Sequence, residues 1–155
     1  MLMDEGMDSG DILTQEETPL GPEETFGQLH DRLSHLGAEL LLKTIDQVIS
    51  GSVRRQAQNA AGVTFAPRLT KETGRINWNN NIRNIVNLIR GLCPAPAAYT
   101  SLDGQALKIF SAEALPADIL QPSGTIAAPV EAGLPVAAAD GYVILKEIQL
   151  AGKKR

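Results

Sequence analysis

Acidic residues and glycines alternate in the first eleven residues, MLMDEGMDSGD. Asp4, Asp8 and Asp11 supply carboxylates, which can hold a proton, orient a basic side chain or bind a cation. Gly6 and Gly10 permit the backbone of a tight loop, and loops of this kind often lie where ligands bind. Because the D-x-D-x-D-G spacing and the closing Glu of an EF-hand are absent, we expect no metal site here.

Basic residues gather in a second stretch, TFAPRLTKETGRINW, which spans residues 64–78 and ends on the only tryptophan. Three bases stand against one acid there: Arg68, Lys71 and Arg75 against Glu72. A proline and a glycine interrupt any helix, so the stretch is predicted to be an extended, ordered entrance to a second domain.

Charge is unevenly distributed along the chain. Residues 1–31 contain nine acidic residues and no Lys or Arg, whereas residues 32–155 contain 14 basic and nine acidic residues. Such a separation indicates a polyanionic partner for the second half. On charge alone, ordinary solvated surfaces explain a surplus of this size better, and the polyanionic partner stays open as the alternative.

The composition excludes several classes of protein. With the single Cys93, neither an intrachain disulfide nor a cysteine metal cluster can form, and a reducing, cytoplasmic setting is expected. No apolar run approaches the ~20 residues that span a bilayer, and the N-terminus has no signal-peptide pattern. His30 and His35 lie five residues apart, which does not match a helical metal pair, so both are expected at the surface.

The elements predicted for the first half are two short strands and one long helix. Met1–Met3 and Ile12–Gln15 are the predicted strands, and a helix of about 25 residues is predicted to start at Thr25 and stop at Gly51. Thr25 and Gln28 form a capping box. The helix carries an apolar stripe that must pack against another element, and residues 52–62 are a predicted linker.

In the second half, a short helix precedes a series of strands. Asn79 or Asn80 is expected to cap that helix; Ile82, Ile85, Val86 and Ile89 face a core, while Arg83 and Arg90 face away. The predicted strands are Tyr99–Leu102 and Ala106–Ala112, joined by Asp103-Gly104, then Gly124–Ala128, Val136–Ala138 and Tyr142–Gln149. Ala114–Pro122 is the predicted long connection, and Asp140-Gly141 a second hairpin turn.

These segments, in this order, resemble the methionyl-tRNA formyltransferase family. TFAPRLTKETGRINW, IRGLCPAPAAYTSLDGQALKIF and LAGKKR are similar to its carboxy-terminal domain, and MDEGMDSGDIL to the folate-side loop of its catalytic domain. The resemblance implies an α+β chain: the tail of a Rossmann-like α/β domain (1–51), a linker (52–63), and a small OB-like antiparallel β-barrel with one helix (64–155). Five or so short strands also favour such a barrel.

The resemblance implies transfer of a formyl group from formyltetrahydrofolate to the amino group of methionyl-initiator tRNA in translation initiation, without a metal. Of the family's catalytic Asn, His and Asp, only the Asp has a counterpart, which we place at Asp8. It would support the catalytic His or a water while the attacking amine loses a proton. The accompanying folate-side loop residues are Asp4, Glu5, Gly6, Met7 and Gly10. Without the resemblance, Asp8 would be interpreted as a turn residue.

The family's barrel helps to hold tRNA, which requires Lys and Arg for phosphate contacts. The candidates are Arg54, Arg55, Arg68, Lys71, Arg75, Arg83, Arg90, Lys153, Lys154 and Arg155. Arg68 and Lys71 lead because they lie in the matching motif. Each base could instead belong to an ion pair or a solvated surface.

The chain departs from the family pattern at Asn77, where an Asp usually precedes the tryptophan, and at Ala95, where a tryptophan is common. Counterparts of the catalytic Asn and His are absent, so we expect a truncated fragment that does not transfer formyl groups alone. Separately, we expect a monomer. Two alternatives remain: a non-catalytic tRNA-binding module, or another folate-dependent formyltransferase or hydrolase of the same superfamily.

Overall fold

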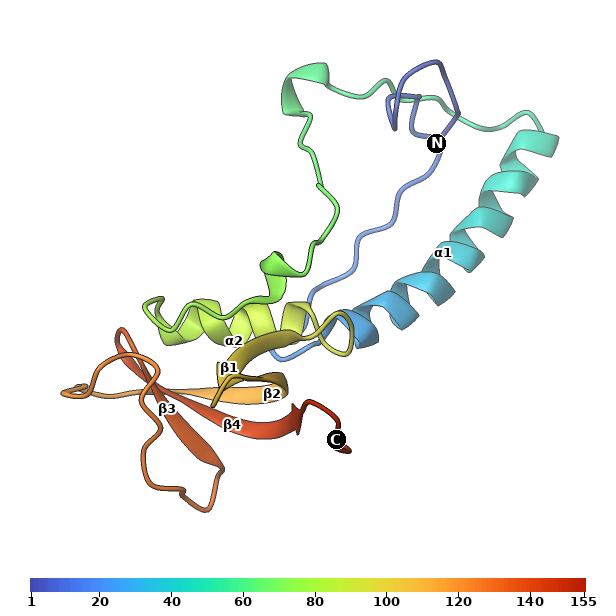
Figure 1. The fold of residues 1–155 in the computed structure, drawn as a ribbon. Helices are drawn as coiled ribbons and strands as arrows, with labels where there is room; N and C mark the ends of the chain where they lie inside the picture. Colours follow the sequence, from blue (N-terminus) through green and yellow to red (C-terminus); the bar gives the residue numbers. More distant parts are fainter. The chain divides into compact units, whose positions relative to one another are not determined.

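The computed structural model describes residues 1–155, which divide into two units (Figure 1). The first unit comprises Met1–Pro22 and Leu29–Arg68; the second comprises Glu23–Gln28 and Leu69–Arg155. The helices are α1 (Phe26–Ile49) and α2 (Ile82–Gly91), with short 3-10 turns η1 (Ala60–Gly62) and η2 (Glu72–Gly74). Neither long helix combines the length and apolar character that crossing a bilayer demands.

The predicted long helix is confirmed as α1. The Thr25 amide donates to Oε1 of Gln28 at 3.0 Å, and the Gln28 amide donates back to Oγ1 of Thr25 at 3.4 Å, so the capping box forms. Gly51, with φ of +69°, follows the end of the helix. No residue of α1 is buried, and its apolar stripe remains exposed to solvent.

The two strands predicted in the first unit are wrong. Residues 1–3 are irregular, and Ile12 forms only an isolated bridge with Gln56, in which each amide donates to the other's carbonyl at 2.9 Å. A strand needs a neighbouring strand to complete its hydrogen bonds, and the first unit offers only that single pairing. Within residues 52–62, Gln56 makes this pairing with Ile12.

The second unit is an α+β structure built on a curled, four-stranded antiparallel sheet in the order β1-β2-β4-β3. The strands are β1 (Ala98–Leu102), β2 (Gln105–Pro116), β3 (Leu134–Ala138) and β4 (Gly141–Leu150). The core stripe predicted for α2 packs against this sheet. Ile85 and Ile89 are almost fully buried, as are Ile109 of β2 and Val143 of β4.

The first hairpin is confirmed. Asp103 and Gly104 have φ of +47° and +77° and join Leu102 to Gln105, as expected for a two-residue turn. The connection predicted to begin at Ala114 is wrong at its start, because β2 continues to Pro116 and stays paired with β4. A shift of register between Ile109 and Ala112 lets β2 bend along this longer path.

Residues 124–128 do not form the predicted regular strand. Gly124 and Ala127 donate to carbonyls of β3, and Ile126 forms an isolated bridge with Val136. Pro135 accepts from Ala127 but has no N–H with which to donate back, so the ladder ends there. The regular sheet therefore has four strands, fewer than the five or so predicted.

The cap of α2 and the second turn both differ from the prediction by one residue or two. The cap is Asn81, whose Oδ1 accepts from the Asn84 amide at 2.8 Å; neither Asn79 nor Asn80 fills that role. The turn lies at Ala139-Asp140, because β4 already begins at Gly141. Asp140 instead accepts from the Ile82 amide at 2.8 Å, so a turn residue completes the helix N-terminus.

Candidate functional site

Asp4 organises the acidic loop. Its Oδ1 accepts from the Gly6 amide at 3.0 Å and from Oγ of Ser9 at 2.8 Å, and Leu2 donates to the Asp11 carbonyl at 2.9 Å. An aspartate that bonds the amide two residues ahead is a common way of closing a tight loop. Asp4 is therefore a structural residue of the loop, a role that the sequence did not distinguish from that of Asp8.

Asp8 stands at the exposed tip of the same loop with φ of +54°. Gln58 holds its backbone, because Nε2 of Gln58 donates to the carbonyls of Asp8 and Gly10, each at 2.8 Å. No hydrogen bond or ion pair engages the Asp8 carboxylate. The loop thus fixes the backbone of Asp8 and leaves its carboxylate free to accept a proton or orient another group.

The other loop residues differ in how exposed they are and in how much space surrounds them. Glu5 and Met7 are exposed, Met7 by 93%, whereas Gly10 is buried. A Cβ at Gly10 would lie 2.0 Å from the Leu2 carbonyl oxygen, so only glycine fits there. No group of three or more His, Cys, Asp or Glu side chains in the structure could hold a metal ion.

The basic stretch is anchored by buried residues that alternate with exposed bases. Gly74 is buried, and a Cβ there would approach the Ala97 carbonyl to 2.9 Å; Ile76 is buried and donates to the Tyr99 carbonyl at 2.9 Å. Arg68, Lys71 and Arg75 are exposed, and none forms an ion pair with Glu72. These cations are therefore available to a polyanion.

The two arginines of α2 differ. Arg83 is exposed, as predicted for a residue facing away from the core. Arg90 is half-buried; its Nε donates to Oδ1 of Asn87 at 3.1 Å and its Nη1 to the Glu24 carbonyl at 3.5 Å. Within the second unit, Arg90 consequently links the segment Glu23–Gln28 to α2.

At the C-terminus, Lys153 and Lys154 are exposed but Arg155 is engaged. Its guanidinium donates to both carboxylate oxygens of Glu147, at 2.9 Å for the Nη2–Oε2 pair, and lies 4.2 Å from the Phe110 ring centroid. Hydrogen bonding by Arg155 lowers the pKa of Glu147, and the same bond raises the pKa of Arg155. Burial raises the pKa of the nearby Cys93 thiol.

The predicted bases are divided between the units. Arg54, Arg55 and Arg68 belong to the first unit, and the remaining candidates to the second. Arg54 lines a shallow hollow beside Leu13, Lys43 and Ser52. Within the second unit, Lys71 and Arg75 flank η2 as its N-cap and C-cap, separate in sequence from Arg83 on α2 and from the C-terminal tail.

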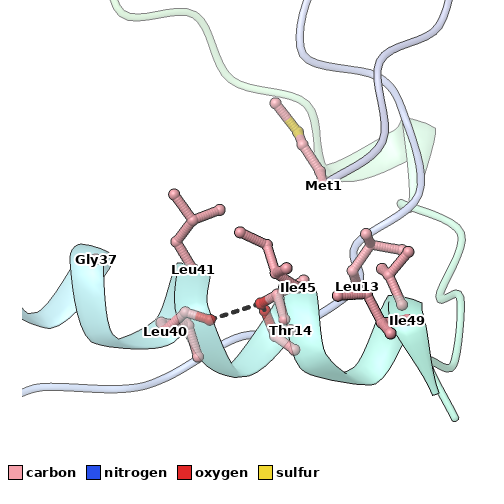
Figure 2. Close-up of a pocket in the computed structure, with 10 residues that line it drawn as sticks. Met1, Leu13, Thr14, Gly37, Leu40, Leu41, Ile45 and Ile49 are labelled. Carbon is pink, nitrogen blue, oxygen red and sulfur yellow. Dashed lines mark hydrogen bonds between the residues drawn. The ribbon is translucent and has the colours of Figure 1, made fainter.

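An apolar groove along α1 was not predicted as a site, although the apolar stripe that makes it was evident. It has a volume of about 410 Å³, and its lining combines Leu40, Leu41, Ile45 and Ile49 of the helix with Met1 and Leu13 (Figure 2). Within the groove, Oγ1 of Thr44 donates to the Leu40 carbonyl at 2.7 Å. The groove offers an apolar contact surface and little for chemistry.

Residues 68–155 match the family described as formyl transferase, C-terminal domain. The whole chain is 47% identical to a methionyl-tRNA formyltransferase of Syntrophus aciditrophicus and 41% identical to one of Alkaliphilus oremlandii, covering 50% of each. The chain thus spans about half the length of the curated relatives it matches.

Solved structures show the same fold at lower identity. The chain superposes on an N-formyltransferase from Helicobacter canadensis in complex with folinic acid and dTDP-3-aminofucose, with a TM-score of 0.70, 21% identity, and coverage of 95% of this chain and 53% of that one. It also superposes on HypX from Aquifex aeolicus in complex with tetrahydrofolic acid, with a TM-score of 0.70, 17% identity, and coverage of 97% and 26%.

Proposed function

This chain belongs to the family described as formyl transferase, C-terminal domain, and we propose that it acts as part of a methionyl-tRNA formyltransferase. That enzyme would transfer a formyl group from formyltetrahydrofolate to the amino group of methionyl-initiator tRNA. The observation that carries the proposal is the 47% identity over all 155 residues to a relative of that name. The proposed substrate implies a cytoplasmic location, and we propose a monomer.

Within this proposal, residues 1–51 complete a Rossmann-like catalytic domain, residues 52–63 connect, and residues 64–155 form the OB-type domain that holds tRNA. Two observations support this division. The family match begins at residue 68, and the sheet and α2 share one core. The exposed stripe of α1 would then be covered by the rest of the catalytic domain.

For catalysis, the attacking amine must lose a proton as it bonds to the formyl carbon. We assign Asp8 to that step, as the carboxylate that orients or supports the group that takes the proton. The free carboxylate of Asp8 and its fixed backbone support the assignment, as does the structural use of Asp4 in closing the loop. The loop residues Glu5, Gly6, Met7 and Gly10 would border the folate donor.

A chimeric enzyme tests the proposal. These 155 residues replace the matching half of the Syntrophus aciditrophicus enzyme, and formyl transfer to methionyl-initiator tRNA is assayed. We expect turnover by the chimera and none by the 155 residues alone, which lack counterparts of the family's Asn and His. In the chimera, Asp8→Asn should reduce kcat by about 10²–10⁴-fold, because a neutral amide cannot stabilise the charge on the group that takes the proton.

Glu5→Gln is the matched control, since it removes an exposed carboxylate from the same loop. Its kcat should stay within a few-fold of the parent. An inactive chimera that is folded and binds tRNA would contradict the proposed function, and equal losses in both variants would contradict the assignment of Asp8.

A further inference from the structure

The second unit contains a hollow of about 480 Å³ that the proposed function does not use. Its lining residues come from the end of the basic stretch and from one loop: Glu72, Arg75, Ile76, Asn77, Trp78, Asn79 and Ser123. A volume of this size lies within the range of small-ligand sites in proteins. The lining combines an indole, a guanidinium, two amides and a carboxylate.

Trp78 is held rigidly at the border of this hollow. Its Nε1 donates to Oγ1 of Thr100 at 3.0 Å, which fixes the ring edge. Gly124 packs against the indole so closely that a Cβ there would lie 3.4 Å from Cδ1 of Trp78. Trp78 also packs against the core of α2 and the sheet, yet it is only partly buried and lines the hollow, so an aromatic side chain in a fixed position borders this space.

The polar groups around the indole retain hydrogen-bonding capacity. Oδ1 of Asn77 accepts from the Asn79 amide at 3.0 Å, which leaves the NH₂ group of Asn77 unused. The Asn79 side chain makes no hydrogen bond, and Arg75 makes no ion pair. Side-chain amides and a carboxylate suit the edges of a nucleobase, and a guanidinium suits a phosphate.

We propose that this hollow binds one unpaired nucleotide of the RNA substrate, with its base stacked on Trp78 and its phosphate at Arg75. This inference rests on the proposed function, because it names a contact made by the tRNA-holding domain. Recognition of unpaired bases on aromatic side chains, with arginine at the backbone, is how proteins generally bind single-stranded RNA. Glu72, Asn77 and Asn79 would contact the base edges.

Because Trp78 is the only tryptophan, its fluorescence reports this site alone. The full chain is titrated with tRNA, with an eight-nucleotide single-stranded RNA, and with polyphosphate of the same charge. Binding is followed in parallel by anisotropy of a labelled RNA. We expect both RNAs to quench the emission of Trp78 and polyphosphate to leave it unchanged, because only a base can stack on the ring.

Variants separate stacking from general charge attraction. Arg75→Gln should weaken binding of the short RNA by about tenfold or more, whereas Lys108→Gln, which removes an exposed lysine of β2 outside the hollow, should weaken it by no more than about twofold. Asn79→Ala should weaken binding by several-fold while the circular dichroism spectrum stays native, which guards against a variant that fails to fold.

The outcomes distinguish this site from the proposed function. Binding of tRNA without a change in Trp78 emission overturns the site and leaves the proposed function standing. Equal effects of Arg75→Gln and Lys108→Gln, or equal quenching by polyphosphate, also overturn the site. Failure of tRNA to bind at all, even at low salt, overturns both.

Discussion

Asp4 and Asp8 occupy the same loop, four residues apart, but their carboxylates have different surroundings. Asp4 is committed to the Gly6 amide and the Ser9 hydroxyl, whereas Asp8 has no such partner. The sequence could place both in a turn but could not tell which one closes it, because that depends on the direction of each side chain. The family resemblance selected Asp8, whose carboxylate, unlike that of Asp4, makes no hydrogen bond within the loop.

The Glu147–Arg155 pair gives a prediction about pH. Arg155 lowers the pKa of Glu147 below its usual 4.5, so the pair stabilises the fold above that pH and loses its effect as pH falls through the lowered value. We expect the free energy of unfolding to fall less between pH 6 and pH 3 in Glu147→Gln than in the parent. Urea titrations at both pH values measure this difference.

Glu131→Gln is the control for that experiment, because Glu131 is exposed and has no ion-pair partner. It should follow the parent across the pH range. If Glu147→Gln followed the parent too, the ion pair would make no contribution in solution.

At the scale of elements, the N-terminus of α2 depends on side chains from two places in the chain. Asn81 supplies the cap and Asp140 accepts from Ile82. Asn81→Ala should reduce the free energy of unfolding by about 1 kcal/mol, within the range of 0.5–2 kcal/mol measured for caps. Chemical denaturation of the full chain provides the measurement.

Asn80→Ala is the matched control, since Asn80 precedes the cap and its side chain makes no hydrogen bond. It should leave stability unchanged to within about 0.5 kcal/mol. A larger loss in Asn80→Ala than in Asn81→Ala would show that α2 begins earlier in solution.

The periodic helix α2 and the first Asp-Gly hairpin were predictable, whereas the helix cap and the irregular structure of residues 124–128 were not. The stripe Ile82, Ile85 and Ile89 predicted α2, and the Asp103-Gly104 turn predicted the first hairpin. The cap is Asn81, and Asp140, which is distant in sequence, accepts from the first amide of the helix.

Residues 124–128 do not form a regular strand because Pro135, on the partner strand, lacks the N–H donor that the ladder needs. Both differences depend on residues that are distant in the sequence, so the residues within the predicted element do not reveal them.

The candidate site was predictable in composition but not in arrangement. The acidic loop and the basic stretch were evident from residue types, but Gln58 holding the Asp8 backbone and Glu147 engaging Arg155 were not. Each contact joins residues that are separated in the sequence, and the fold of the chain between them decides whether they meet. The division between free and engaged bases therefore required the structure.

At the scale of the whole molecule, the surplus of positive charge beyond residue 31 predicts salt-dependent tRNA binding. Lys71→Gln should reduce the slope of log affinity against log salt by about 0.7–0.9, as expected for one lost phosphate contact. Filter binding at a series of salt concentrations measures the slope.

Lys108→Gln is the control, because it removes an exposed lysine of β2 that the proposal does not assign to tRNA. Its slope should equal that of the parent. A slope that is flat in every protein would count against phosphate contacts altogether.

The exposed stripe of α1 has a consequence for the lifetime of the chain in a cell. Leu41, Leu42 and Val48 are each more than half exposed, and Ile49 is 79% exposed, on a helix with no buried residue. Exposed apolar side chains on one helix favour aggregation and capture by chaperones and proteases. We therefore expect the cellular abundance of these 155 residues to depend on how quickly another protein surface covers the apolar residues of α1.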